Sequence, residues 1–351
     1  MLLFIFLTLL ALMQCILAIP TVPDTLNVTL SQVSNTRIKA EVTNTGNDDL
    51  TIVHLNFFGD TAPIKKVSQP NQPETELVFN GIKMRLVLDN LTSDALTTIP
   101  AGESLVDEFD IASTLDITDS GPITVHTSGW VPIASDHEIV FYLPYTSNTL
   151  TINIDAAKAA TISKALTLTS SLHRRTRLRD CNANQDAIMR TALDNAMHMS
   201  IAAANEAWKG SAARMEEYFK SSSEETRSLV ANRLAYIAAE SSLNADRTTY
   251  YCSDKFQFCT DRVLAYTIPE WNVVVNCPLY WSRLMPVQTT CHAQDQANTV
   301  IHEFTHAPAV YAPGTDDLGY GYKAAMRLTK DQAIRNADTY TLFANAVFVG
   351  C

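Results

Sequence analysis

The alternation of hydrophobic and polar residues changes character near the middle of the chain. Before residue 150, short segments alternate apolar and polar positions, are rich in β-branched residues and are separated by turn-forming clusters such as residues 44–48. Period-two alternation between turns is typical of β-strands. This region therefore predicts a compact β-sandwich of roughly 130 residues. The clearest segments are RIKAEV (37–42), LTIVHLNFF (50–58), MRLVL (84–88) and PITVHTSGWVPI (122–133).

Beyond residue 180 the apolar residues instead recur three and four positions apart. Residues 185–209 and 225–240 follow this spacing and are rich in Ala, Leu, Met and Arg, which favours helices. We therefore expect the second half to be mainly α. The 351 residues, 46% hydrophobic and 18% charged, are enough for two globular domains.

The amino terminus is one apolar run, MLLFIFLTLLALMQCILA, without an acidic residue. Its length and the small residue Ala18 favour a cleaved signal peptide over a signal anchor. No later stretch reaches the ~20 apolar residues that a membrane helix needs, so we expect a secreted, extracellular product that leaves the membrane once the signal is removed. Possible N-glycosylation sites at Asn27 and Asn90 fit such a route.

A basic, poorly periodic segment joins the two regions. It contains Arg174 and Arg175, a pair of the kind that processing proteases recognise, although a plain solvated linker is the alternative. The expected division is a signal peptide (1–18), a β-rich propeptide (19–175) and a second domain (176–351). The net charge is −11. Neither part has the basic excess that is typical of nucleic-acid binders, so we expect no nucleic-acid partner.

Six of the seven cysteines lie in the second half, and the seventh, Cys15, lies in the signal region. An even number of cysteines in an exported chain predicts disulfides, with fifteen possible pairings for six. The pattern alone does not choose among them. The six are Cys181, Cys252, Cys259, Cys277, Cys291 and Cys351.

The candidate chemistry is concentrated in HEFTHAPAVYAPGTDDLGYG, residues 302–321. On a helix, His302 and His306 lie one turn apart on one face, so both imidazoles can reach one metal ion. Glu303 then lies where its carboxylate can contact a metal-bound water. The alternative is an ordinary pair of surface or core histidines.

A catalytic zinc takes three protein ligands and keeps one position for water. The third ligand must come from outside the helix. Because no His follows His306 and no Glu follows Glu303, aspartate is the only strong ligand type available downstream. A surface position is the better interpretation of His292. The candidates are Asp316, Asp317, Asp338 and His292.

HEFTH followed by GTDDLGYG resembles the paired motifs of the deuterolysin (aspzincin) family, which are secreted fungal neutral zinc metalloendopeptidases. The layout is also similar, with a signal, a long propeptide, a basic processing pair and a six-cysteine domain that ends on its last cysteine. The resemblance implies a catalytic domain of zincin type with three disulfides, made as a preproprotein. The fixed positions of the second motif are occupied by Gly314, Thr315, Asp317, Tyr320 and Gly321.

The resemblance also implies a role for individual residues. His302, His306 and Asp317 would bind one Zn²⁺, Glu303 would be the general base, and Tyr320 would stabilise the transition state. For Asp338, a place in the substrate pocket or behind a metal ligand is favoured over binding the metal itself. Tyr280 matches a tyrosine implicated in activity, and a position in the hydrophobic core is the equal alternative. The implied disulfides are Cys181–Cys252, Cys259–Cys277 and Cys291–Cys351.

The expected function is therefore that of a secreted, zinc-dependent endopeptidase, made as a zymogen processed after Arg175. The enzyme is expected to be a monomer. Its expected partners are protein or peptide substrates, with a preference for basic proteins, and its own propeptide before processing. The alternative is an exported zinc-binding effector or binding protein on the same fold without peptidase activity. Glu303 and Tyr320 argue against it, because a binding protein needs no general base.

Overall fold

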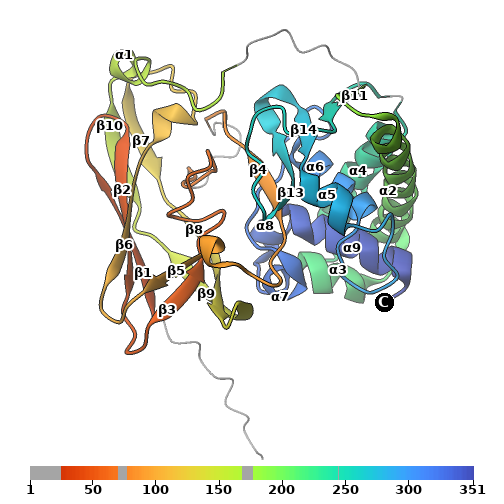
Figure 1. Ribbon diagram of the computed structural model, residues 1–351, viewed down its shortest axis with the longest axis horizontal. Helices are drawn as coiled ribbons and strands as arrows, with labels where there is room; N and C mark the ends of the chain where they lie inside the picture. Colours follow the sequence, from red (N-terminus) through yellow and green to blue (C-terminus); the bar gives the residue numbers. More distant parts are fainter. Residues whose placement is uncertain (1–24, 70–76, 168–176, 244) are drawn as a thin grey trace, which may run out of the picture.

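The computed structural model describes residues 25–69, 77–167, 177–243 and 245–351. The proposed signal peptide and the pair Arg174–Arg175 lie outside the described residues. Figure 1 shows two bodies side by side: a β-rich first half, residues 25–167, and a second half, residues 177–351, that combines helices with a sheet. The described residues contain no helix long and apolar enough to cross a membrane.

The first half is built from antiparallel sheets, most of which pack around one main hydrophobic core. In β2 the buried positions alternate with more exposed ones, so that Ile38, Ala40 and Val42 face the core, as period-two patterning predicts. Three small sheets contribute to this core. Their strands are, in spatial order, β1 (Leu26–Gln32), β2 (Arg37–Asn44) and β6 (Ser104–Asp110) in the first sheet; β5 (Leu96–Ile99), β3 (Leu50–Val53), β8 (Ser128–Ser135) and β9 (Glu138–Thr146) in the second; and β10 (Leu150–Ile154) and β7 (Gly121–Val125) in the third. Along the chain, the short helix α1 (Ala156–Ala159) follows β10.

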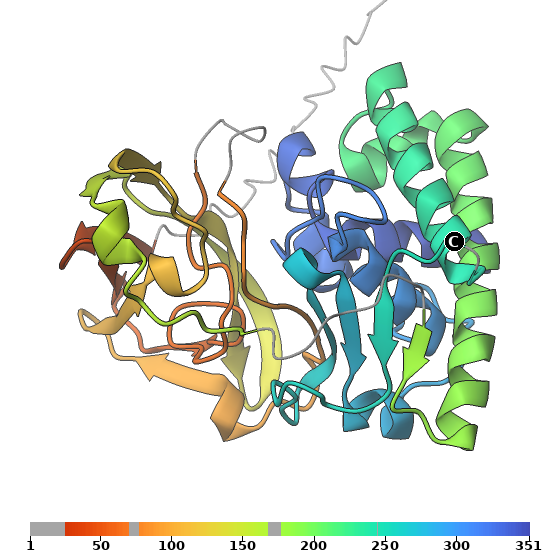
Figure 2. The same ribbon diagram turned by 90° about the horizontal axis from the view of Figure 1, so that it is seen from above.

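The helices of the second half include both segments that the apolar spacing predicts. Residues 185–209 lie in α2 (Ala183–Lys209), and residues 225–240 lie in α4 (Glu224–Ser241). These two long helices pack on each other, on the side away from the first half (Figure 2). The other helices are α3 (Ala212–Phe219), α5 (Pro278–Arg283), α6 (Gln296–His306), α7 (Gly321–Ala325), α8 (Lys330–Ala333) and α9 (Ala337–Val349).

A five-stranded sheet runs beside these helices, so the protein is a mixed helix-and-sheet structure and the prediction of a mainly α second half is not confirmed. All six residues of β13 are buried. A strand covered on both faces has a continuous apolar run rather than an alternating one, which a helix can also have. The strand order is β11 (Arg177–Arg179), β12 (Thr249–Tyr251), β14 (Val273–Asn276), β13 (Val263–Ile268) and β4 (Lys83–Leu86).

The last strand of this sheet, β4, comes from the first half of the chain. The segment MRLVL contributes a strand, as the sequence pattern predicted. The prediction that this strand belongs to the first-half sheets is wrong. It pairs antiparallel with β13, with Met84 opposite Tyr266 and Arg85 opposite Ala265. The two halves therefore share one sheet.

Three disulfides cross-link the second half: Cys181–Cys252, Cys259–Cys277 and Cys291–Cys351. These are the pairs that the family resemblance implies. The third one attaches the carboxyl-terminal residue to the loop that leads into α6.

Candidate metal centre and active site

Helix α6 carries His302, Glu303 and His306, and all of its residues are buried. It begins with a capping box, in which the Asp295 carboxylate accepts from the backbone N–H of Asn298 over 2.6 Å and the Asn298 side chain accepts from Asp295 N over 3.1 Å. The cap satisfies amide groups that a buried helix end would otherwise leave without partners. The carboxyl end of the helix therefore emerges at a fixed place in the core.

The chain turns back after α6 and brings the second motif to the histidines. The N–H of Thr315 donates to Thr305 O over 2.9 Å, which holds the returning loop against the end of the helix. A Cβ on Gly314 would lie 2.3 Å from His306 O, so only glycine permits this close approach. Asp317, two residues after Thr315, faces the two imidazoles.

His302, His306 and Asp317 form a buried group suited to a metal ion. The Asp317 Oδ1 atom lies 3.1 Å from His302 Nε2 and 3.2 Å from His306 Nε2. None of these three atoms has a hydrogen-bond partner within the described part of the chain. Nitrogen and oxygen ligands ~2.0–2.2 Å from a tetrahedral zinc lie roughly 3.4 Å apart, close to the spacing observed. The donor set and its burial therefore fit Zn²⁺.

The other nitrogen of each imidazole is already engaged. His302 Nδ1 lies 2.9 Å from Asp338 Oδ1, and His306 Nδ1 lies 3.0 Å from Thr315 O. Donation of Nδ1–H to these acceptors leaves each Nε2 lone pair directed at the centre, which is the usual arrangement of metal-binding histidines. Burial by itself lowers the pKa of His302, but contacts with Asp317 and Asp338 outweigh it and raise this pKa to about 9. The carboxylates around His302 thus favour a positive charge between the two imidazoles and Asp317.

Two other candidates for the third ligand lie outside this group. The Asp316 carboxylate is bound by cations: its Oδ1 lies 2.7 Å from Lys83 Nζ and its Oδ2 lies 2.5 Å from Arg335. His292 stacks on the Tyr322 ring, with centroids 4.0 Å apart, and its Nε2 lies 2.6 Å from the hydroxyl of Tyr218. His292 is therefore part of an aromatic cluster rather than an isolated surface residue.

The two groups expected to act in catalysis lie beside the metal-binding group. The Glu303 Oε2 atom accepts from the Thr267 hydroxyl over 2.7 Å, while its Oε1 is buried with no hydrogen-bond partner among the described residues. Burial raises the pKa of Glu303 to about 7, near the value that suits a general base at neutral pH. Burial also raises the pKa of Tyr320 well above its usual value, so this phenol remains a proton donor.

Tyr280, the remaining candidate, lies in the hydrophobic core of the second half and is completely buried. Its hydroxyl donates to Gln296 O at the start of α6 over 3.4 Å. This position matches the core alternative that its sequence left open. Thr267, which orients Glu303, lies on β13 outside both motifs, and no sequence signal pointed to it.

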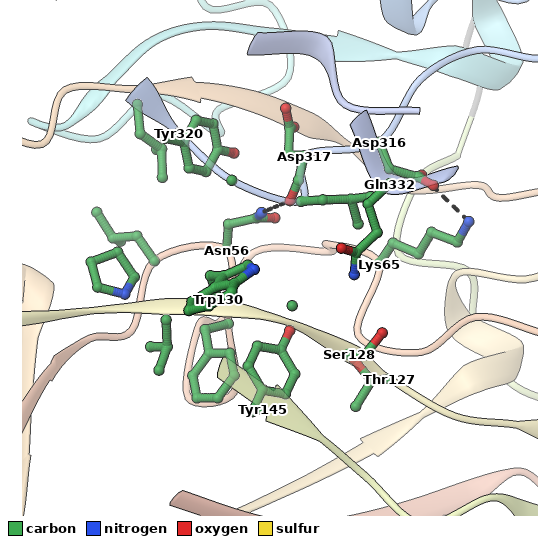
Figure 3. Close-up of a pocket in the computed structure, with 18 of the residues that line it drawn as sticks. Asn56, Lys65, Thr127, Ser128, Trp130, Tyr145, Asp316, Asp317, Tyr320 and Gln332 are labelled. Carbon is green, nitrogen blue, oxygen red and sulfur yellow. Dashed lines mark hydrogen bonds and ion pairs between the residues drawn. The ribbon is translucent and has the colours of Figure 1, made fainter. Parts of the chain in front are cut away.

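The first half of the chain covers this site. Asn56 Nδ2 donates to Asp317 O over 3.0 Å. Figure 3 shows a cavity between the halves, in which Asn56, Lys65 and Trp130 of the first half face Asp316 and Asp317 of the second. The cavity has a volume of about 130 Å³, and Asp317 and Tyr320 are among the residues that line it.

Comparison with known proteins gives a consistent result along the chain. A model of the deuterolysin metalloprotease (M35) family matches residues 3–351. Penicillolysin of Penicillium citrinum is 52% identical over 345 residues, which cover 97% of each chain. A neutral protease 2 homologue of Aspergillus oryzae is 52% identical over 327 residues, covering 93% of this chain and 92% of the relative. A solved zinc peptidase from Grifola frondosa matches with a TM-score of 0.40 and 20% identity, over 47% of this chain and 97% of the other.

Proposed function

The chain belongs to the deuterolysin metalloprotease (M35) family and is a zinc metalloendopeptidase, and from this premise we propose how its centre works and how the chain is processed. His302, His306 and Asp317 hold one zinc ion. The three mutually facing, otherwise unpartnered buried ligand atoms carry this assignment. When bound, zinc polarises the scissile carbonyl and makes a water molecule acidic enough to attack it at neutral pH.

Glu303 acts as the general base. Thr267 holds its Oε2 oxygen, which leaves Oε1 to take the proton of the attacking water and later pass it to the leaving amine. Tyr320 donates its phenolic hydrogen to the oxygen that becomes negative as the carbonyl is attacked. One such donor is typically worth ~2.7 to 4 kcal/mol of transition-state stabilisation.

Asp338 has two roles in this proposal. It accepts from His302 Nδ1 and so orients a zinc ligand, and it forms the acidic wall of the pocket for the residue after the scissile bond. The Arg85 guanidinium already lies beside this carboxylate, 2.9 Å from Asp338 Oδ1 and 3.0 Å from Asn298 Oδ1. This contact supports a preference for basic residues after the cleaved bond, and hence for basic protein substrates.

The chain is made as a secreted zymogen. Residues 1–18 form the signal peptide, residues 19–175 a sandwich-like β-rich propeptide, and residues 176–351 the catalytic domain, which is released as a monomer by cleavage after Arg175. Three disulfides fit an extracellular protein, and the side chains of Asn27 and Asn90 are exposed, as glycosylation requires. The cover that residues 25–167 form over the metal ligands supports the zymogen.

A zinc-binding protein without peptidase activity remains the alternative on the same fold. Binding alone gives no reason for a buried glutamate with one oxygen held by Thr267 and the other facing no partner among the described residues. A general base needs this arrangement. The arrangement therefore favours a peptidase over a protein that only binds zinc.

The test compares the chain cut after Arg175 and freed of its first half with its Glu303→Gln variant prepared in the same way. Both samples are assayed on a basic protein substrate, and zinc is measured in both. We expect about one zinc in each and cleavage by the parent alone, since glutamine fills the same space but cannot take a proton. A parent that holds zinc and cleaves nothing contradicts the proposal, and so does a variant as active as the parent.

A further inference from the structure

Strand β4 adds to the sheet of the second half in the way an extended peptide binds to an exposed sheet edge. Residues Lys83–Leu86 run antiparallel to β13, and Lys83, Met84 and Arg85 lie opposite Thr267, Tyr266 and Ala265. Pairing of this kind supplies affinity through the main chain and specificity through side-chain pockets. Since Thr267 is also the partner of Glu303, the added strand passes directly along the catalytic groups.

The main chain of Met84 is bound at both of its polar groups by residues of the active site. Its N–H donates to Asp317 Oδ2 over 3.1 Å, and its carbonyl accepts from the Tyr320 hydroxyl over 2.7 Å. Tyr320 is the donor that the proposed mechanism assigns to the scissile carbonyl. The carbonyl of Met84 therefore occupies the place of the carbonyl to be attacked.

The next residue fills the pocket that the mechanism assigns to the residue after the scissile bond. Only 2% of Arg85 is exposed. Its guanidinium lies 2.9 Å from Asp338 Oδ1 and 3.0 Å from Asn298 Oδ1. One residue further on, the Leu86 carbonyl accepts from Gln294 Nε2 over 2.9 Å. Along the strand, a carbonyl bound by Tyr320 is followed by a cation bound by Asp338. This is the order that the proposed mechanism requires of a substrate.

The folded first half holds both ends of this segment. Before the strand, Ile82 N donates to Pro63 O over 3.0 Å, and after it Leu91 N donates to His137 O over 2.9 Å. Lys83 adds an ion pair of 2.7 Å to Asp316 of the second half. A peptide that is already ordered in its bound shape loses little entropy on binding, which raises its affinity.

We propose that Lys83–Leu86 is a substrate-mimicking inhibitory strand, with the Met84–Arg85 bond at the position of the bond to be cleaved and Arg85 in the basic-residue pocket. The first half is then a competitive, tight-binding partner of the second half, and a cut after Arg175 yields full activity only when the first half dissociates. This inference rests on the proposed peptidase function.

The test uses the full chain with Arg174 and Arg175 replaced by alanine, so that the halves stay joined. The probe is a short internally quenched peptide with arginine after the scissile bond. Adding Arg85→Glu places a carboxylate beside Asp338, and we expect hydrolysis at least about tenfold faster than in the uncut parent, because like charges in a buried pocket expel the strand. Arg85→Ala should act in the same direction if the glutamate variant fails to fold.

Two variants serve as matched controls. Arg85→Lys keeps the positive charge and should remain closer to the uncut parent than Arg85→Glu. Arg262 of the second half also binds the first half, donating to Asp89 O over 3.0 Å, but outside the pocket. Arg262→Ala therefore loosens the interface without freeing the site, and we expect no comparable gain.

Failure of this inference is distinguishable from failure of the proposed function. If the parent cut after Arg175 and freed of its first half hydrolyses the probe while uncut Arg85→Glu and Arg85→Ala remain inactive, only the inhibitory strand is refuted. An equal gain in Arg262→Ala also refutes it. A second readout is size-exclusion chromatography of chains that keep Arg174 and Arg175 and have been cut after Arg175. We expect the halves of the otherwise unchanged chain to elute together and the Arg85→Glu halves to separate, and co-elution of both would overturn the proposal.

Discussion

Asp338 and His302 are joined by a contact of 2.9 Å between Oδ1 and Nδ1, and the same carboxylate oxygen lies 2.9 Å from a guanidinium nitrogen of Arg85. A single oxygen thus contacts both a candidate zinc ligand and the cation in the neighbouring pocket. The second oxygen accepts from Gly321 N over 2.6 Å, which fixes the carboxylate in place. In the proposed mechanism, orientation of the metal ligand and selection of a basic residue are therefore coupled through one side chain.

Replacing Asp338 by asparagine in the chain cut after Arg175 and freed of its first half should affect both functions. We expect zinc affinity to fall by about 10- to 100-fold, the usual effect of losing a carboxylate behind a metal-binding histidine. The preference for arginine over leucine after the scissile bond should fall as well. Chelator competition measures the first effect, and kcat/KM on two peptides that differ only at that residue measures the second. Unchanged zinc affinity would show that Asp338 does not support His302.

The adjacent residues Asp316 and Asp317 offer a matched pair of variants. Asp317→Ala removes a proposed zinc ligand and should abolish stable zinc binding and activity. Asp316→Asn should keep zinc, because this carboxylate pairs with Lys83 and Arg335 instead. Zinc content after dialysis against a weak chelator is the measurement. Equal zinc loss in both variants would contradict the assignment.

Tyr320→Phe tests the donor to the developing oxyanion. In the cut chain freed of its first half, we expect kcat to fall by roughly 10²- to 10³-fold. KM and zinc content should change little, because the hydroxyl acts mainly in the transition state. Steady-state kinetics on a peptide substrate separates the two parameters. A variant with parental kcat would remove Tyr320 from the mechanism.

The disulfides should differ in their contribution to stability. Cys259–Cys277 spans 18 residues and Cys181–Cys252 spans 71. The chain-entropy model assigns about 3 and about 4.5 kcal/mol to loops of these lengths. Replacing both cysteines of one pair by serine avoids a free thiol, and denaturant unfolding of each double variant gives the loss. The larger loss is expected for Cys181–Cys252, and the reverse order would contradict the model.

Asp295 should make stability depend on pH between about 4 and 6. Burial raises the pKa of this helix-capping carboxyl from its ordinary value of 3.8 to about 6. The folded state then binds the proton more tightly than the unfolded state, so the favourable contribution is complete below pH 4 and is lost as the pH rises through 6. Asp295→Asn keeps an oxygen for the cap but does not titrate.

The measurement is the unfolding temperature of parent and Asp295→Asn at a series of pH values. The parent should lose stability relative to the variant as the pH rises from 4 to 7. A shift of about two pKa units corresponds to roughly 3 kcal/mol at most. A difference between the two proteins that stays constant with pH would show that Asp295 titrates normally.

The sequence predicted those parts of the structure that depend on local patterns. Helices α2 and α4 follow from the spacing of their apolar residues, and the two motifs bring His302, His306 and Asp317 together as one group. The motif places the histidines one helical turn apart, and the return of the chain after Gly314 brings Asp317 beside them. Both effects act over fewer than about 20 residues.

The features that the sequence did not predict depend on contacts between distant residues. β13 is buried on both faces, so its apolar run carries no alternation that would identify a strand. The segment MRLVL was expected to pair within the first half, but the partner of a strand is chosen by tertiary packing, which the sequence pattern does not contain. For the same reason nothing in the sequence indicated that Arg85 would meet Asp338, 253 residues away.

The position of β4 at the end of the shared sheet also bears on how the protein avoids aggregation. With β14 on one side and β4 on the other, every strand edge of β13 is paired. Departure of the first half would uncover the edge of β13, whose six residues are all buried, and a strand of another copy can add to such an edge. In the proposed mechanism substrate adds to this edge, so the edge cannot be protected permanently with charges or proline. Until it leaves, the first half shields this edge from other copies, and we expect the freed enzyme to be more prone to self-association at high concentration than the uncut chain.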